Sequence, residues 1–189
     1  MMNLPNQITI VRLVVSLFVF IMLPLQKFSA ALILFLIAAT TDWMDGYLAR
    51  KYGLITQLGR ILDPFADKIL ICGAFIFLAA EPGSQIVAWM AVVVVGRELL
   101  VTALRSFLEQ QGADFSANMA GKVKMVVQCA AVVLSLYVLT CRVPGGSTAS
   151  TGLLRLTSAV VWLAVIATLY SGFGYVVSAA RLLRQAPTP

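Results

Sequence analysis

The sequence contains no histidine in its 189 residues. That absence excludes histidine general bases, Ser-His-Asp triads and histidine-ligated metal sites. Any catalysis must therefore use carboxylates, lysine or arginine, hydroxyls, thiols, or a metal ion held by oxygen atoms. The three cysteines, Cys72, Cys129 and Cys141, lie in apolar runs without C-x-x-C spacing. We expect them to be small core residues rather than a disulfide or zinc framework.

Charged residues are also scarce. They make up 12% of the chain, whereas 60% of it is hydrophobic. A soluble domain is usually about one quarter charged, so this composition is typical of an integral membrane protein. Spans of roughly 20 residues use most of the chain and leave no room for a separate soluble domain. We expect a single all-α membrane domain over residues 1–189, with six transmembrane helices at about 8–26, 29–50, 61–80, 84–108, 118–141 and 153–180.

The basic residues are distributed unevenly around these expected spans. An even number of spans puts both chain ends on one side, together with the connections after the second and fourth spans. Basic residues concentrate on the cytoplasmic side of a membrane, so the richer side is expected to be cytoplasmic. The poorer side carries Lys27, Arg142 and Arg155. The richer side carries Arg12, Arg50, Lys51, Arg60, Lys122, Lys124, Arg181 and Arg184.

Against this apolar background, four of the eight acidic residues lie within the stretch 41–68. Asp42 and Asp45 are three residues apart, and Asp63 and Asp67 are four apart, so each pair occupies one helix face. Four neighbouring carboxylates repel one another unless cations lie among them. Oxygen-only ligation suits Mg²⁺ or Mn²⁺, ions that usually accompany phosphate substrates. One of the carboxylates can also take a proton from an incoming hydroxyl group.

Small residues accompany the first aspartate pair. Gly46 and Ala49 lie on the same helix face, so a bulky group can approach the carboxylates closely. Arg50 follows within reach of an anion on that face. The alternative is that the four carboxylates only form ion pairs with Arg50, Arg60 and Lys68. The small residues between the acids argue against that alternative.

The residues of this stretch match the pattern D-x2-D-G-x2-A-R-x8-G-x3-D-x3-D at every fixed position. The pattern resembles the signature of the CDP-alcohol phosphatidyltransferases. The resemblance implies a six-helix membrane enzyme, usually a homodimer, whose four aspartates hold two divalent cations, Mg²⁺ or Mn²⁺. Asp67 is implied to be the general base as well as a ligand, whereas Asp42, Asp45 and Asp63 are principally ligands. The implied binding site for the CDP headgroup includes Asp42, Gly46, Ala49, Arg50 and Gly59.

The N-terminal segment LPNQITIVR is similar to the P-N-x2-T-x2-R segment of bacterial members of that family. In those members the segment lies near the nucleotide. Asn6 and Thr9 offer an amide and a hydroxyl group to cytosine. They would equally serve as capping residues before the first span, and the sequence leaves both interpretations open.

Ionisable residues inside the later spans indicate the acceptor. Arg97, Glu98 and Arg105 lie in or near a span, where a charge is costly and normally faces a cavity or a partner. GRELLVTALRSFLEQQG and GKVKMVVQ resemble the acceptor half of family members that use sn-glycerol 3-phosphate. The resemblance implies that Arg97, Arg105 and Lys122 hold its phosphate. Thr102 is a weaker candidate, because its hydroxyl can bond its own helix, and we expect Glu98 to orient an arginine.

The expected reaction transfers the phosphatidyl group from CDP-diacylglycerol to sn-glycerol 3-phosphate and releases CMP. We expect it at the cytoplasmic face of a bacterial inner membrane, among membrane lipids and with no nucleic acid as partner. The rivals within the family are a transferase for inositol phosphate and a cardiolipin synthase of this fold. The cation cluster argues against an unphosphorylated acceptor. A cation transporter is a further alternative, disfavoured because the carboxylates lie at span ends and the chain has no internal repeat.

Overall fold

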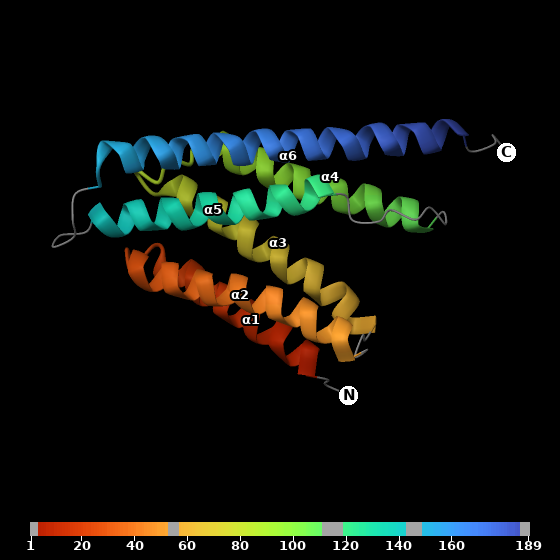
Figure 1. The fold of residues 1–189 in the computed structure, drawn as a ribbon, viewed down its shortest axis with the longest axis horizontal. Helices are drawn as coiled ribbons and strands as arrows, with labels where there is room; N and C mark the ends of the chain where they lie inside the picture. The colour runs from red at the N-terminus through yellow and green to blue at the C-terminus, as the bar shows by residue number, and fades with distance from the viewer. Residues whose placement is uncertain (1–3, 53–56, 111–118, 143–148, 186–189) are drawn as a thin grey trace.

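The computed structural model is all-helical over the residues that it describes, as expected from the sequence (Figure 1). The helices within that part are α1 (Leu4–Met22), α2 (Phe28–Tyr52), α3 (Gln57–Ala80), α4 (Ala88–Gln110), α5 (Met119–Arg142) and α6 (Thr151–Gln185). The backbone is described for residues 4–52, 57–110, 119–142 and 149–185. Side chains within these ranges are not described for residues 4–6, 8, 42–52, 57–64, 67, 107–110, 119–120, 178 and 181–185.

The first helix begins and ends earlier than the expected span of 8–26. It starts at Leu4 because Pro5 fits the first turn, where the missing N–H of proline has no intrahelical role. It ends at Met22, just before Pro24, which disfavours a helical conformation of the residue that precedes it. The two prolines therefore account for where this helix begins and ends.

The fourth helix begins later than the expected start at residue 84. Gln85 has a φ of 68°, in the left-handed region, so the helix cannot extend back through it. The hydroxyl of Ser84 accepts a hydrogen bond from the amide of Ile86 at 3.2 Å and stabilises this turn. Regular helix then starts at Ala88.

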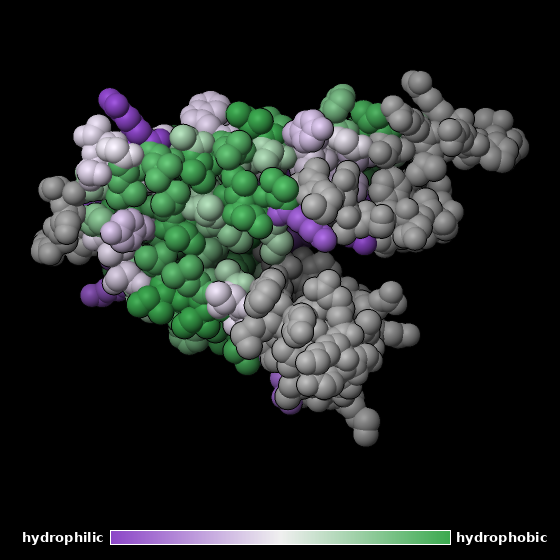
Figure 2. Space-filling model, in the orientation of Figure 1, coloured by the Kyte–Doolittle hydropathy of each residue, from purple (hydrophilic) through white to green (hydrophobic). Residues whose placement is uncertain are grey.

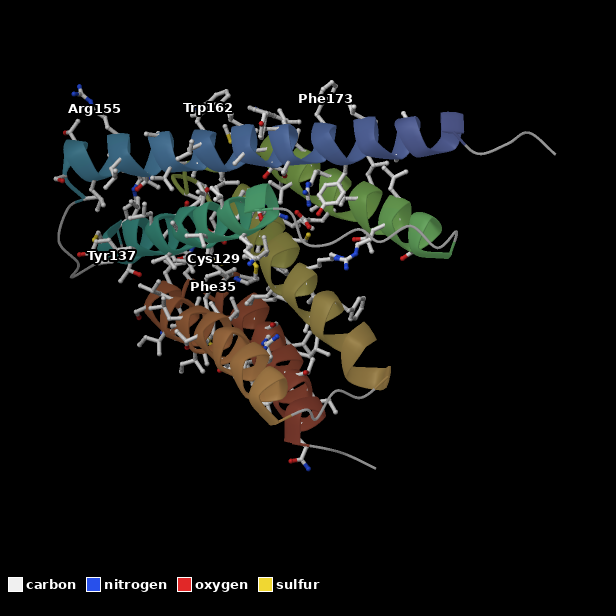
Figure 3. The ribbon with its side chains drawn as sticks, turned by 45° about the vertical axis from the view of Figure 1, so that its right-hand side comes forward. Phe35, Cys129, Tyr137, Arg155, Trp162 and Phe173 are labelled. Atoms are coloured by element: carbon white, nitrogen blue, oxygen red, sulfur yellow. The ribbon has the colours of Figure 1, made fainter. Side chains whose placement is uncertain are left out.

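Helix α3 crosses the middle of the bundle and contacts α1, α2, α4 and α5. Figure 1 shows α6 along one side with α4 and α5 beneath it, and α1 with α2 on the opposite side. One hydrophobic core runs through these layers. Phe35 of α2, which is fully buried, lies at the junction between α2 and α5 (Figure 3).

The chain alternates in direction from helix to helix. The C-terminal ends of α2 and α4 and the N-terminal ends of α3 and α5 therefore lie toward the same end of the bundle (Figure 1). Both chain termini are at that end. The stretches expected to bind donor and acceptor thus lie at one end of the molecule, which we call the polar end.

The outer surface of the described part is strongly apolar. Val126 and Phe173 are 69% and 72% exposed, and Figure 3 shows Trp162 and Phe173 pointing away from the bundle. Figure 2 shows hydrophobic residues over most of the visible face away from the polar end. The stretches Gly121–Arg142 and Thr151–Val177 are long and apolar enough to cross a membrane. Shorter apolar helical stretches are Thr9–Met22, Phe28–Thr41 and Lys68–Ala80.

Candidate active site

The expected donor site lies where α2 and α3 approach the polar end. Asp42 and Asp45 belong to the C-terminal half of α2, whereas Asp63 and Asp67 belong to the N-terminal half of α3. The two helices contact each other. If the four carboxylates of these two neighbouring helices meet, they would form an oxygen-only donor set of the kind that suits Mg²⁺ or Mn²⁺.

The side chains of these four aspartates lie outside the described residues, so their role as metal ligands stays a prediction. Among the side chains that are described, no three acidic or cysteine residues lie close enough together to hold a metal ion. The other predicted donor-site residues outside the described side chains are Asn6, Gly46, Ala49, Arg50 and Gly59.

Helix α1 places a buried polar face in the bundle. Thr9 and Arg12 are each 1% exposed and Ser16 is fully buried, and these three residues share one face of the helix. The hydroxyl of Ser16 donates to the carbonyl of Arg12 at 2.8 Å. Because α1 begins at Leu4, Thr9 lies inside the helix and does not cap it. Sequence reasoning did not name Arg12 as a site residue, although it is the last fixed position of the P-N-x2-T-x2-R segment.

A pocket of about 190 Å³ lies between α3, α4 and α5. This volume is below the roughly 300 Å³ at which pockets for drug-sized ligands begin, so it suits a small polar molecule. Figure 2 shows hydrophilic side chains at the upper edge of a hollow between the two groups of helices. Three cations and one carboxylate are among the lining residues, which makes the pocket attractive to anions. Its lining residues are Lys68, Ile71, Glu98, Arg105, Lys124, Met125 and Gln128.

Glu98 connects two cations at the wall of this pocket. Its Oε1 forms an ion pair with the Nζ of Lys124. The same oxygen accepts a hydrogen bond from the Nη1 of Arg97 at 3.2 Å. Glu98 therefore contacts an arginine, as the sequence led us to expect. Because it shares its charge between two cations, neither cation is fully neutralised by it.

The structure brings only part of the predicted acceptor set to the pocket. Arg105 lines it, whereas Arg97 is buried beside Glu98 and donates its Nη2 to the hydroxyl of Ser171 at 2.9 Å. The hydroxyl of Thr102 donates to the backbone carbonyl of Glu98 at 2.6 Å, within its own helix. Lys122 is exposed and is not among the residues that line this pocket.

Lys68 and Lys124 are pocket residues that sequence reasoning did not assign to the acceptor. Lys124 lies two residues after Lys122, which turns it about 200° round the helix and so to the opposite face. Gln128, one turn beyond Lys124, is 1% exposed and lines the same pocket. The signal for Lys124 was its helical spacing from Gln128 and from Ala131 and Ser135, which are also buried.

Comparison with known proteins gives consistent matches along the chain. A family model described as CDP-alcohol phosphatidyltransferase matches residues 2–170. A Bacillus subtilis (strain 168) protein named CDP-diacylglycerol–glycerol-3-phosphate 3-phosphatidyltransferase is 39% identical, over 93% of this chain and 94% of its own length. Proteins of the same name from Rickettsia bellii (strain RML369-C) and Escherichia coli (strain K12) are 34% and 36% identical. The Rickettsia bellii match covers 92% of this chain and 93% of the relative. The Escherichia coli match covers 71% of this chain and 77% of the relative.

Proposed function

Because this chain belongs to the CDP-alcohol phosphatidyltransferase family, we propose that it transfers the phosphatidyl group of CDP-diacylglycerol to sn-glycerol 3-phosphate and releases CMP. It is then a phosphatidylglycerophosphate synthase of phospholipid biosynthesis. The observation that carries this proposal is the 39% identity, over nearly the whole chain, to a protein named for that activity. The pocket with three cations supports an acceptor that brings its own phosphate.

For the donor, the proposed binding region is the C-terminal part of α2, where the family signature begins. Two divalent cations, Mg²⁺ or Mn²⁺, would be held by Asp42, Asp45, Asp63 and Asp67. When bound, they supply charge neutralisation to the pyrophosphate and to the phosphate that leaves. Thr9 of α1 and Arg50 of α2 are the proposed neighbours of the cytosine and the pyrophosphate.

For the acceptor, the proposed phosphate site is the pocket between α3, α4 and α5. Arg105 offers a fork of N–H donors, and Lys68 and Lys124 offer ammonium groups. Arg97 does not contact the acceptor phosphate; it acts on the site through its hydrogen bond to Glu98. Lys122 stays a prediction as a phosphate ligand, at an exposed position of α5.

In the proposed reaction, the primary hydroxyl of the acceptor gives its proton to Asp67. Its oxygen bonds to the phosphorus that carries the diacylglycerol, and the bond from that phosphorus to the oxygen of the CMP phosphate breaks. Phosphatidylglycerophosphate stays in the membrane and CMP departs. The chain contributes mainly by holding the two substrates with their reacting atoms aligned.

The proposed setting is a bacterial inner membrane crossed by six helices of a single domain, with the polar end in the cytoplasm. The apolar exterior of the bundle and the alternating helix directions support this arrangement. So does the excess of lysine and arginine at the polar end. A homodimer is proposed by analogy with the family.

The test is CMP release by the purified protein in detergent with CDP-diacylglycerol, a divalent cation and one acceptor at a time. We expect release with sn-glycerol 3-phosphate and none with inositol phosphate or phosphatidylglycerol. Release with one of the others but not with sn-glycerol 3-phosphate would overturn the choice of acceptor. Failure with every acceptor would overturn the proposed activity.

A further inference from the structure

Helix α6 carries a row of polar and small residues inside an otherwise apolar sequence. Thr168, Ser171, Gly172 and Tyr175 follow the spacing i, i+3, i+4 and i+7, which puts them on one face of the helix. Thr168, Ser171 and Gly172 are buried, whereas the intervening Phe173 points outward (Figure 3). We call these four residues the α6 stripe. Small and hydroxyl-bearing residues are typical of the faces on which membrane helices pack, and α6 packs on α4 and α5.

Three members of the α6 stripe hold Arg97 of α4. The hydroxyl of Ser171 accepts a hydrogen bond from the Nη2 of Arg97 at 2.9 Å. The guanidinium carbon lies 5.7 Å from the ring centroid of Tyr175, within the range of a cation–π interaction. A Cβ atom at Gly172 would lie 3.0 Å from the Cγ of Arg97, so the arginine stem packs where a larger residue would press on it.

The hydroxyl groups of Thr168 and Ser171 are oriented as acceptors toward the neighbouring helices. Thr168 donates its own hydroxyl proton to the carbonyl of Ala164 at 2.6 Å, and Ser171 donates to the carbonyl of Thr168 at 3.1 Å. Their lone pairs are then available to donors on other helices. The hydroxyl oxygen of Thr168 accepts a hydrogen bond from the side-chain amide of Gln128 on α5 at 2.9 Å.

These contacts lead directly to the pocket. Arg97, held by α6, donates to the Oε1 of Glu98, and the same oxygen pairs with Lys124. Glu98, Lys124 and Gln128 all line the pocket. The α6 stripe therefore contacts the pocket wall by two routes, one through Arg97 and one through Gln128.

We propose that the α6 stripe positions the acceptor site and so sets its affinity for the phosphorylated acceptor, an inference that rests on the proposed function. With Arg97 fixed, Glu98 divides its charge between two cations, and Lys124 keeps charge free to attract a phosphate. If Arg97 is displaced, Glu98 pairs with Lys124 alone and competes with the incoming phosphate. The members of the stripe act through Arg97 and Gln128, so they are positioning residues.

The experiment compares Ser171→Ala and Gly172→Ala with Gly174→Ala, where an added Cβ meets no atom within 4 Å. In each variant the KM for sn-glycerol 3-phosphate and the KM for CDP-diacylglycerol are measured by CMP release. We expect the two stripe variants to raise the acceptor KM about tenfold, the scale of a lost hydrogen bond to a charged group. The donor KM should stay unchanged, Gly174→Ala should match the unchanged protein, and Ser171→Thr, which keeps the hydroxyl, should restore the acceptor KM.

An unchanged acceptor KM in both stripe variants, with an active parent protein, would overturn this inference and leave the proposed function standing. An equal rise of both KM values would also overturn it, because that is the sign of a general structural defect. No CMP release from the parent protein would overturn the proposed function and this inference together. Should Gly172→Ala fail to fold, Ser171→Ala decides the outcome, since it removes a single oxygen atom.

Discussion

Glu98 of α4 and Lys124 of α5 form an ion pair inside the helix bundle, where they are 6% and 7% exposed. Arg97 donates to the same carboxylate oxygen at 3.2 Å. One carboxylate thus holds together two buried cations from two helices, at the wall of the proposed acceptor pocket. Removing one partner of a buried ion pair leaves an uncompensated charge, which costs much more than the intact pair contributes.

Glu98→Gln should destabilise the protein by about 3 kcal/mol or more, because Arg97 and Lys124 would then lie buried without a counter-charge. The measurement is unfolding in detergent, followed by circular dichroism or by a thiol-reactive dye. The matched control is Glu98→Gln combined with Lys124→Met, which removes one of the two cations and should recover part of the loss. Equal stability of Glu98→Gln and the parent protein would contradict the account.

Gly73→Ala should weaken the contact between α1 and α3. A Cβ at Gly73 would overlap the ring of Phe20, which stacks on Phe77 with ring centroids 5.3 Å apart. Such overpacking costs about 1–3 kcal/mol. The control is Gly96→Ala on α4, where the added Cβ meets no atom within 4 Å. Stability should fall in the first variant only, and Phe20→Leu should restore part of it.

Asp67→Asn should lower CMP release by about a hundredfold or more, because the amide cannot take the proton of the acceptor hydroxyl. Removing divalent ions with a chelator should abolish release in the parent protein, and Mg²⁺ or Mn²⁺ should restore it. Metal binding, measured by calorimetry, should be largely retained in Asp67→Asn. Full activity in this variant would remove Asp67 as the base.

Much of the fold could be predicted because a lipid environment requires long apolar helices and places charged residues near their ends. Apolar runs long enough for helices, separated by polar breaks, predicted the six helices of the described part of the chain and their order. The boundaries that differed depended on local conformation, such as the left-handed Gln85 before α4 and the prolines that flank α1. Such details depend on a few backbone angles that hydrophobicity does not report.

For the acceptor site, the sequence shows which residues are charged but not the helix faces on which they lie, so the roles of the individual cations stay predictions. Lys122 and Lys124 are both lysines, yet they lie on opposite faces of α5, and Lys124 is the buried one. Arg97 was expected to meet the phosphate, and the structure adds contacts with Glu98, Ser171 and Tyr175 that the sequence did not indicate. Ser171 itself gave no signal, since a hydroxyl in an apolar helix usually bonds its own backbone.

If the acceptor phosphate binds in the pocket between α3, α4 and α5, the KM values of Lys124→Ala and Lys122→Ala should differ. Both changes remove one positive charge from the start of the same helix, but only Lys124 lines the pocket. Lys124→Ala should raise the KM for sn-glycerol 3-phosphate about tenfold or more and leave the KM for CDP-diacylglycerol unchanged. Lys122→Ala should have a much smaller effect. A larger effect from Lys122→Ala, or a rise in the donor KM alone, would contradict that placement of the phosphate.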